Sequence, residues 1–313
     1  MKLSIVVPCY NEEDNVLLIY DEITAALKKE KINYEIVFIN DGSKDKTMLK
    51  LKEIANNSDE YIKIINFSRN FGKEAAMYAG LKESTGDFVA IIDADMQQKP
   101  SLILKMLDIL TKNEEYDSVA TYQKKRKDPF IKKIFSNLFY KIINKISEVK
   151  FVPGASDFRL FRRTMVNAII EMTEYYRFSK GIFSWVGFNT YYIPYEADKR
   201  AFGKTKWSFI KLFKYAIEGI VSFTTTPLRI STFLGMFISF FAFIYLLVTI
   251  IQTVMFGNDV PGYASILGTV LLLGGIQLLS LGIIGEYLAR TYVETKKRPI
   301  YISKEIIDNK NKK

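Results

Sequence analysis

Short apolar runs alternate with longer segments of helical spacing over the amino-terminal part of the chain. The short runs are rich in β-branched residues and predict five strands, Leu3–Val7, Tyr34–Asn40, Ile62–Phe67, Phe88–Asp93 and Asp117–Thr121. The segments between them predict four helices, Asp14–Lys29, Asp45–Asn56, Lys73–Ser84 and Pro100–Leu110. Ser43 suits the cap of the second helix, and Pro100 suits the first turn of the fourth. The alternation predicts an α/β fold with a mostly parallel, Rossmann-like sheet, whose ligands bind beyond the carboxyl ends of the strands.

Two later segments combine apolar residues at helical spacing with lysines. They are Phe130–Ile146, which follows a basic run at residues 124–127, and Trp207–Val221. Basic amphipathic helices can lie in the headgroup layer of a membrane. The same pattern also fits a helix that packs on its own domain, so the sequence leaves both interpretations open.

Two long apolar stretches follow, Ile230–Phe256 and Ala264–Ala289, and no Lys or Arg lies between Arg229 and Arg290. Each stretch exceeds the ~20 residues needed to cross the hydrocarbon core. We therefore predict two transmembrane helices and not a helical hairpin inside a soluble core. The connecting turn, Gly257–Tyr263, contains no cation, whereas basic residues follow the second stretch. By the positive-inside rule, both termini and the amino-terminal domain lie in the cytoplasm and the protein is integral to the cytoplasmic membrane.

Composition narrows the chemistry that the domain can perform. The 44 basic and 34 acidic residues give a net charge of +10, which indicates an anionic partner such as nucleic acid, anionic lipid or a phosphorylated substrate. The 313-residue chain has no histidine, which excludes Ser-His-Asp and Cys-His sites and histidine-ligated zinc. The single cysteine, Cys9, lies in an apolar run and is expected to be a buried small hydrophobic residue.

Polar side chains gather where the predicted strands end. Asp93 and Asp95 are two residues apart where the fourth strand opens into a loop, and such a pair can share Mg²⁺ with diphosphate oxygens. Polar residues also end the first strand and the second, where they could hold a base and a ribose. Ordinary turn and helix-cap chemistry explains each of these residues taken singly.

Several motifs, in this order, resemble family 2 glycosyltransferases: Pro8-Cys9-Tyr10-Asn11-Glu12, Asn40-Asp41-Gly42-Ser43, Arg69-Asn70-Phe71-Gly72-Lys73 and Asp93-Ala94-Asp95-Met96-Gln97. Within that family the chain resembles the bacterial polyprenyl-phosphate (bactoprenol) glucosyltransferases, relatives of dolichyl-phosphate mannose synthase. The likeness extends along nearly the whole chain through three further motifs, Gly154–Arg159, Arg200–Trp207 and Thr226–Arg229.

The resemblance implies a GT-A fold and a role for particular residues. Around the nucleotide sugar it implies Pro8, Tyr10, Glu12 and Asp41. Around the diphosphate and a Mg²⁺ or Mn²⁺ ion it implies Asp93, Asp95 and Gln97. Asp157 matches the proposed catalytic carboxylate, for which a salt bridge to Arg159 or Arg162 is the structural alternative. Arg200 and Lys206 match cations of a loop that closes over the diphosphate and the acceptor phosphate.

Two positions depart from the family pattern. Met96 replaces the usual leucine, which is a tolerable apolar exchange. Gln123 stands where relatives often carry an arginine, ahead of Arg126, the third expected ligand of the acceptor phosphate.

The resemblance implies inverting transfer of a hexose, glucose from UDP-glucose, to polyprenyl (undecaprenyl) phosphate at the cytoplasmic membrane face. N-acetylglucosamine and mannose remain alternative sugars, and a membrane scaffold with a degenerate transferase domain is the non-enzyme alternative. A processive synthase is disfavoured because its Gln-x-x-Arg-Trp motif is absent. We expect no nucleic-acid partner, and association between copies of the chain stays open. The expected parts are a GT-A domain at 1–203, an amphipathic segment at 204–229, membrane helices at 230–256 and 264–290, and a basic tail at 291–313.

Overall fold

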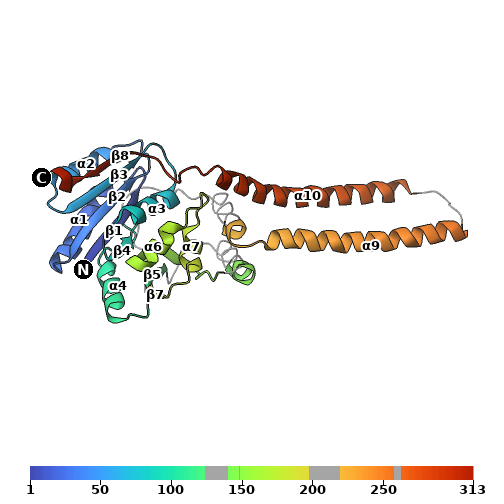
Figure 1. The fold of residues 1–313 in the computed structure, drawn as a ribbon, viewed down its shortest axis with the longest axis horizontal. Helices are drawn as coiled ribbons and strands as arrows, with labels where there is room; N and C mark the ends of the chain where they lie inside the picture. Colours follow the sequence, from blue (N-terminus) through green and yellow to red (C-terminus); the bar gives the residue numbers. More distant parts are fainter. Residues whose placement is uncertain (124–139, 148, 197–218, 257–261, 313) are drawn as a thin grey trace. The chain divides into compact units, whose positions relative to one another are not determined.

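The computed structural model describes residues 1–123, 140–147, 149–196, 219–256 and 262–312 (Figure 1). The chain divides into two units. One comprises Met1–Gly219 together with Arg298–Lys313, and the other comprises Ile220–Lys297. The first unit therefore contains both ends of the chain.

An eight-stranded sheet forms the centre of the first unit, with the order β7-β5-β6-β4-β1-β2-β3-β8. The five predicted strands are confirmed as β1 (Lys2–Cys9), β2 (Asn33–Asn40), β3 (Tyr61–Phe67), β4 (Phe88–Ile91) and β5 (Ser118–Gln123). Three more strands come from later parts of the chain, β6 (Ala155–Arg162), β7 (Thr190–Tyr195) and β8 (Ser303–Asp308). Strands β1 to β4 are mutually parallel where they pair, whereas β6 and β8 run antiparallel to β4 and β3.

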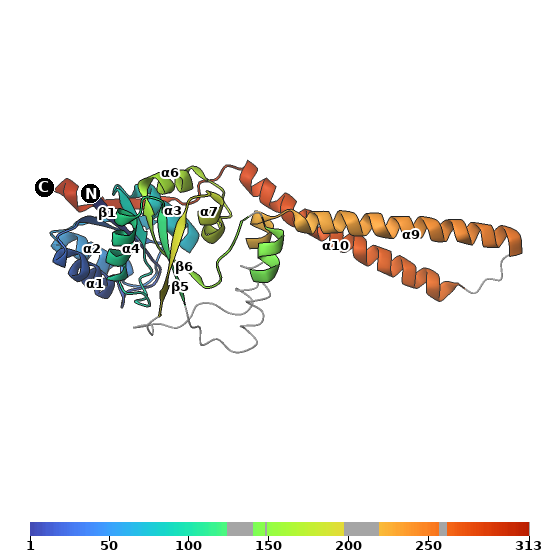
Figure 2. The same ribbon diagram turned by 90° about the horizontal axis from the view of Figure 1, so that it is seen from below.

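Helices cover both faces of this sheet (Figure 2). On one face lie α1 (Val16–Lys29), α2 (Thr47–Asn57) and α4 (Leu102–Lys112), and on the other lie α3 (Lys73–Glu83), α6 (Arg163–Glu171) and α7 (Ser179–Trp185). Strands buried on both faces need apolar side chains at consecutive positions, which explains the continuous run Ile5–Val7 in β1. The predicted helices and the α/β class are thus confirmed.

Helix α3 lies unusually close to the sheet at Gly80. A Cβ atom at this position would overlap the side chain of Val6 on β1 and approach that of Ile39 on β2. Glycine removes this obstacle and lets the helix rest directly on the two central strands. The close packing fixes the amino-terminal end of α3, where Lys73 lies, relative to the carboxyl ends of those strands.

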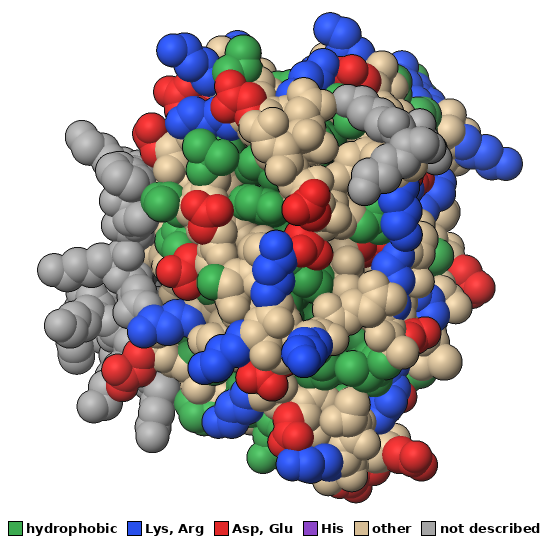
Figure 3. Space-filling view, turned by 90° about the vertical axis from the view of Figure 1, so that its left-hand side faces the viewer, with side chains coloured by type: hydrophobic (Ala, Val, Ile, Leu, Met, Phe, Trp, Pro, Cys, Tyr) green, Lys and Arg blue, Asp and Glu red, His purple; other side chains and the backbone are tan. Residues whose placement is uncertain are grey.

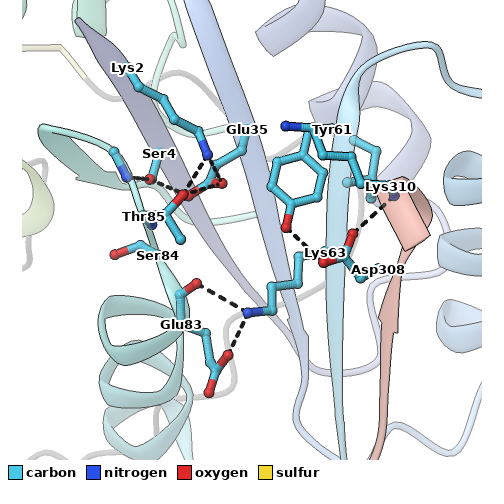
Figure 4. A network of polar contacts seen from close by, with 12 residues as sticks. Lys2, Ser4, Glu35, Tyr61, Lys63, Glu83, Ser84, Thr85, Asp308 and Lys310 are labelled. Atoms are coloured by element: carbon cyan, nitrogen blue, oxygen red, sulfur yellow. Dashed lines mark hydrogen bonds and ion pairs between the residues drawn. The ribbon is translucent and has the colours of Figure 1, made fainter.

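The last strand of the sheet follows the second unit in the sequence. The basic tail expected at 291–313 contains β8, which pairs antiparallel with β3 and is followed by a short 3-10 helix, Asn309–Lys312. Figure 4 shows Asp308 of this strand accepting a hydrogen bond from the hydroxyl of Tyr61 on β3, at 2.8 Å.

The same view shows buried Glu35, on β2, accepting hydrogen bonds from Lys2, Ser4 and Thr85. Burial raises the pKa of Glu35, but these donors outweigh burial and lower it overall, so the carboxylate stays charged.

The second unit contains two long helices, α9 (Thr226–Phe256) and α10 (Tyr263–Thr295). Each includes a span long and apolar enough to cross a membrane, Thr226–Gln252 with mean hydropathy 2.5 and Gly268–Thr295 with mean hydropathy 1.9. None of the most apolar window in either helix is buried inside the protein. Large apolar side chains such as Phe237 and Leu278 are exposed. Such surfaces are suited to lipid contact, and the two apolar helices agree with the predicted hairpin.

Some local predictions need correction. Helix α2 begins at Thr47, where Asp45 accepts the backbone hydrogen bond, so Ser43 is not its cap. Helix α4 begins at Leu102, and Pro100 lies in the turn before it and not in the first turn of the helix. Strand β4 ends at Ile91, which puts Asp93 in the following loop. Of the two amphipathic segments, only residues 140–146 and 219–221 are among the described residues, and these are helical.

Candidate active site

The loops that follow β1 and β2 hold one another at the carboxyl edge of the sheet. The backbone N–H of Asn11 donates to Ser43 Oγ at 2.9 Å, and that of Glu12 donates to Thr47 Oγ1 at 2.8 Å. In return, Asn11 Oδ1 accepts the backbone N–H of Lys44. These reciprocal bonds fix the end of β1, which carries the predicted nucleotide-binding residues Pro8, Tyr10 and Glu12.

Asp41 ties the end of β2 to the loop that follows β3. Its two carboxylate oxygens accept the backbone N–H groups of Phe71 at 2.6 Å and Gly72 at 3.0 Å. Burial raises the pKa of Asp41 to about 6, although the two amide bonds and the charge of Arg69 act in the opposite direction. Gly42, at φ +63°, lies so close to the backbone of Arg69 that a Cβ atom would overlap it. Each carboxylate oxygen can accept a further hydrogen bond. The expected contact of Asp41 with the nucleotide sugar therefore stays a prediction.

Lys73 brings the two predicted acidic positions together. Strand β6 runs antiparallel to β4 with Arg159 opposite Ile91, so Asp157 comes level with the loop residue Asp93. Lys73 Nζ, on the first residue of α3, lies 2.7 Å from Asp93 Oδ1 and 2.8 Å from Asp157 Oδ2. One ammonium group therefore bridges the predicted metal ligand and the predicted catalytic carboxylate.

The charges around Asp157 keep it ionised. Burial raises the pKa of its carboxyl group, but the charges of Lys73, Lys180 and Arg159 and the Lys73 hydrogen bond hold that pKa well below the usual range. Burial likewise lowers the pKa of Lys73, and the two carboxylates more than compensate and raise it overall. Both partners of this ion pair are therefore charged at neutral pH.

Asp95 and Gln97 lie in the same loop as Asp93. Gln97 donates its backbone N–H to Asp95 Oδ1 at 3.2 Å, and Met96 between them has the left-handed φ of 60°. Asp93, Asp95 and Gln97 offer only oxygen ligands, which suit a hard divalent cation. Among the described residues, no three Asp, Glu, Cys or His side chains converge as a preformed metal site. Within the same residues, the buried Asp157 Oδ1 has no hydrogen-bond partner. The ammonium of Lys73 lies between the carboxylates of Asp93 and Asp157, so a positive charge is accommodated there.

The structural alternative for Asp157 was a salt bridge to Arg159 or Arg162. The structure instead pairs Asp157 with Lys73. The Arg159 guanidinium lies 5.0 Å from the ring centre of Phe183, while Arg162 donates to the backbone carbonyls of Tyr116 and Leu110. Asp157 thus does form an ion pair, but with a residue at the carboxyl edge of the sheet.

Comparison with known proteins identifies the family. The model of glycosyl transferase family 2 matches residues 4–170, and that of the GtrB C-terminal hairpin matches residues 226–291. The chain belongs to glycosyltransferase family 2. It is 46% identical to the putative glycosyltransferase CsbB of Bacillus subtilis, over 99% of this chain and 93% of that protein. It is 41% identical to the bactoprenol glucosyl transferase of Shigella phage SfX, over 97% of this chain and 99% of that protein.

A solved glycosyltransferase structure shows a more distant likeness. Glucosyl-3-phosphoglycerate synthase of Mycobacterium tuberculosis, crystallised with Mn²⁺, UDP-glucose and glycerol 3-phosphate, superimposes with a TM-score of 0.47 and 15% identity. The match covers 70% of this chain and 78% of that one.

Among the described residues of the glycosyltransferase, Lys73 lies in the candidate site although no role was predicted for it. Lys73 belongs to a motif that carries the family resemblance, but only its position at the start of α3, after a strand-end loop, signals a function. Of the remaining predicted residues, Arg126, Arg200 and Lys206 lie outside the described residues. Cys9 is confirmed as a buried residue, and burial raises the pKa of its thiol well above the usual value, with Glu12 adding to the rise.

Two further features of the surface are a cavity and a mixed distribution of charge. A cavity of about 530 Å³ is lined by Tyr140, Lys141, Asn144, Lys145 and Pro153, none of which is a predicted site residue. On the face in Figure 3, basic and acidic side chains are interspersed. A nucleic-acid surface usually gathers cations on one face or stripe, so the net charge of +10 does not mark this face as one.

Proposed function

We propose that this glycosyltransferase transfers glucose from UDP-glucose to a polyprenyl phosphate, such as undecaprenyl phosphate, with inversion at the anomeric carbon and at the cytoplasmic face of the membrane. The observation that carries the proposal is the Lys73 ammonium between Asp93 and Asp157 at the carboxyl edge of the sheet. The GtrB-type hairpin and the full-length likeness to a bactoprenol glucosyl transferase support the lipid acceptor.

The donor end of the site is built from the strand-end loops. Ligands of open α/β sheets bind where the strand order reverses, which in this sheet is between β1 and β4. Pro8, Tyr10 and Glu12 at the end of β1 and Asp41 at the end of β2 are therefore suited to the uridine. The reciprocal bonds between the two loops hold these strand ends in place before the donor arrives.

A divalent cation, Mg²⁺ or Mn²⁺, completes the proposed donor site. Asp93, Asp95 and Gln97 would hold it, and their oxygen ligands and the cation already accepted beside Asp93 fit this assignment. When bound, the ion neutralises charge that develops on the departing diphosphate. Lys73 supplies a second positive charge in the same region from the protein itself.

The transfer itself needs no strong base. A phosphate monoester has a second pKa near ~6 and is largely dianionic at neutral pH. One acceptor oxygen forms the new bond to the anomeric carbon while the bond from that carbon to the UDP oxygen breaks, and UDP leaves with the electron pair. Asp157, held ionised by Lys73, orients the acceptor or sugar. Arg126, Arg200 and Lys206 are expected to screen the repulsion between the two anions.

The connectivity of the chain supports a single-sided topology. Residues before Gly219 and after Arg298 belong to the same folded unit, so the two membrane spans begin and end on one side. No Lys or Arg lies between Arg229 and Arg290, whereas Lys296, Lys297 and Arg298 follow α10. The positive-inside rule favours the cytoplasm for that side, where nucleotide sugars are made.

A lipid-product assay tests the proposal. Membranes containing the protein are incubated with undecaprenyl phosphate and, separately, with labelled UDP-glucose, UDP-N-acetylglucosamine or GDP-mannose, and the lipid is then extracted. We expect label in the lipid with UDP-glucose. Label from another donor would replace glucose as the sugar, and the absence of label from all three would overturn the proposed acceptor.

Asp157→Asn provides the matched variant for this assay. The amide keeps the shape of the side chain and removes its charge. Transfer should fall by at least roughly a hundredfold, while donor affinity measured by calorimetry changes little. Near-normal turnover, or a loss confined to donor binding, would contradict the role of Asp157.

A further inference from the structure

An aromatic cluster joins the C-terminal tail to the loop that precedes Lys73. The ring of Tyr301 stacks on Phe67, the last residue of β3, with centroids 4.8 Å apart and planes 18° apart. Phe67 in turn meets Phe71 edge to face at 5.7 Å. Tyr301 also meets the edge of Tyr78 on α3, at 6.4 Å. The cluster therefore includes the strand before the loop at residues 68–72, the loop itself and the helix after it.

Backbone contacts hold Tyr301 in this position. The N–H of Ser68 donates to the carbonyl oxygen of Ile302 at 2.9 Å, directly beyond the point where β8 pairs with β3. Tyr301 is half-buried, and this burial raises the pKa of its hydroxyl to about 12. The tail thus approaches the start of the active-site loop by its backbone as well as by its ring.

The same loop carries the groups that organise the site. The backbone N–H groups of Phe71 and Gly72 bind the carboxylate of Asp41, and the next residue is Lys73. A displacement of Phe71 would therefore move the backbone N–H groups of Phe71 and Gly72 and, with them, the backbone of Lys73. Aromatic contacts of this geometry stabilise the fold beyond the area that they bury, so they favour the loop conformation in which the rings meet.

We infer that Tyr301 is a positioning residue for glycosyl transfer: its ring fixes the loop at residues 68–72 and thereby holds Lys73 against Asp93 and Asp157. The inference rests on the proposed role of that charged cluster. It also assigns a function to the segment that directly follows the second membrane helix. The active-site loop is complete only when the chain that has crossed the membrane returns to the catalytic sheet.

The tail offers a matched control at its other end. There Asp308 accepts the hydrogen bond of Tyr61, on the part of β3 that lies furthest from the loop (Figure 4). Asp308→Asn weakens the attachment of the tail without touching the aromatic cluster. Tyr301→Leu removes the stacked ring, and Tyr301→Phe keeps it while removing the hydroxyl.

The experiment uses the full chain in membranes and compares these three variants with the wild type. Melting temperature is measured for each, together with kcat and KM for the donor and the hydrogen exchange of the amides of Phe71 and Gly72. For Tyr301→Leu we expect kcat to fall about tenfold or more and exchange at both amides to accelerate. Tyr301→Phe should restore both, and Asp308→Asn should lower the melting temperature while keeping kcat within about twofold.

Equal losses of kcat in Tyr301→Leu and Asp308→Asn, with unchanged exchange at Phe71 and Gly72, would overturn the inference, since Tyr301 would then act only through stability. Failure of Tyr301→Phe to restore kcat would do the same. If Tyr301→Leu does not fold, Tyr301→Met takes its place, because it fills the space without a flat ring. Absence of transfer by the wild type would refute the proposed function instead, and the exchange measurement would still decide the role of Tyr301.

Discussion

Replacing Lys73 with methionine tests the central feature of the site. The substitution keeps a long, flexible side chain of similar size and removes the ammonium that contacts Asp93 and Asp157 at 2.7 and 2.8 Å. The two carboxylates then face each other without the charge between them. We expect weaker transfer and, as a separate signature, a changed dependence on pH.

The size of the effect follows from the exposure of the three side chains. Two unit charges 4 Å apart attract by about 4 kcal/mol at an effective dielectric constant of about 20, and by about 1 kcal/mol in bulk water. Exposed fractions of 39% for Lys73, 26% for Asp93 and 17% for Asp157 put the cluster between these limits. After discounting for solvent screening, we assign about 1–1.5 kcal/mol to each contact. A loss of about 2–3 kcal/mol lowers kcat/KM by about thirtyfold to a hundred-and-fiftyfold.

The pH signature has a definite sign. In the wild type the pKa of Asp157 is held well below its usual range, so the carboxylate is charged throughout the assay range. Without Lys73, burial raises that pKa with less opposition, and Asp157 becomes protonated as the pH falls. The ratio of variant to wild-type activity should therefore decrease from pH 8 towards pH 5. Taking the ratio cancels the titration of the acceptor phosphate, which both proteins share.

Lys82→Met is the control, because Lys82 is exposed on the same helix and its replacement makes the same change of charge. Transfer rates of both variants are measured in membranes with saturating acceptor, after their melting temperatures have shown that they are folded. If Lys73→Met kept near-normal activity and a constant ratio across pH, the bridging ammonium would have no part in catalysis. Comparable losses in the two variants would attribute the effect to net charge alone.

Three further outcomes are expected. Asp95→Asn should abolish transfer with the fold intact, and chelation with EDTA should abolish it reversibly, with recovery on adding Mg²⁺ or Mn²⁺; full turnover in EDTA would refute the metal assignment. A cysteine replacing Asp259, outside the described residues, should react with an impermeant reagent in intact cells, whereas one replacing Lys304 should react only after lysis; the reverse pattern would invert the topology. Gly80→Ala should lower the free energy of unfolding by about 1–3 kcal/mol in denaturant titrations, because its methyl group would overlap Val6, and an unchanged midpoint would show that the helix can shift at no cost.

Features that depend on neighbouring positions in the chain could be predicted from the sequence. Helical and strand spacing gave the alternating elements through β5, since periodicity records which side of an element is buried. The two apolar helices were equally evident, because a lipid environment requires about 20 apolar residues in succession. The ordered motifs led to the correct family for the same reason: each occupies a few consecutive residues at a strand end.

Local rules failed where several side chains compete for one role. Ser43 is a residue type that often caps helices, but in the fold its hydroxyl accepts a hydrogen bond from the backbone N–H of Asn11. Asp45 instead accepts the backbone N–H of Thr47, the first residue of α2. The structural alternative for Asp157, a salt bridge to Arg159 or Arg162, is replaced by an ion pair with Lys73 for a related reason. Alternate residues of a strand share a face, yet the Arg159 guanidinium lies over Phe183 and acts on Asp157 only through its charge, whereas the ion pair of Asp157 is formed by a lysine on another element.

The sequence by itself determined the family, the class of the fold, the apolar hairpin and the strand ends at which a site should form. Only the tertiary structure brought Lys73 to Asp93 and Asp157, which are 20 and 84 positions away in the chain. It also brought Tyr301 against Phe67, although the apolar hairpin lies between these two residues in the sequence. Periodicity and motifs record which side of a segment is buried and which residues end it. Contacts between distant segments depend instead on strand order and register, which are set when all the strands pack into one sheet.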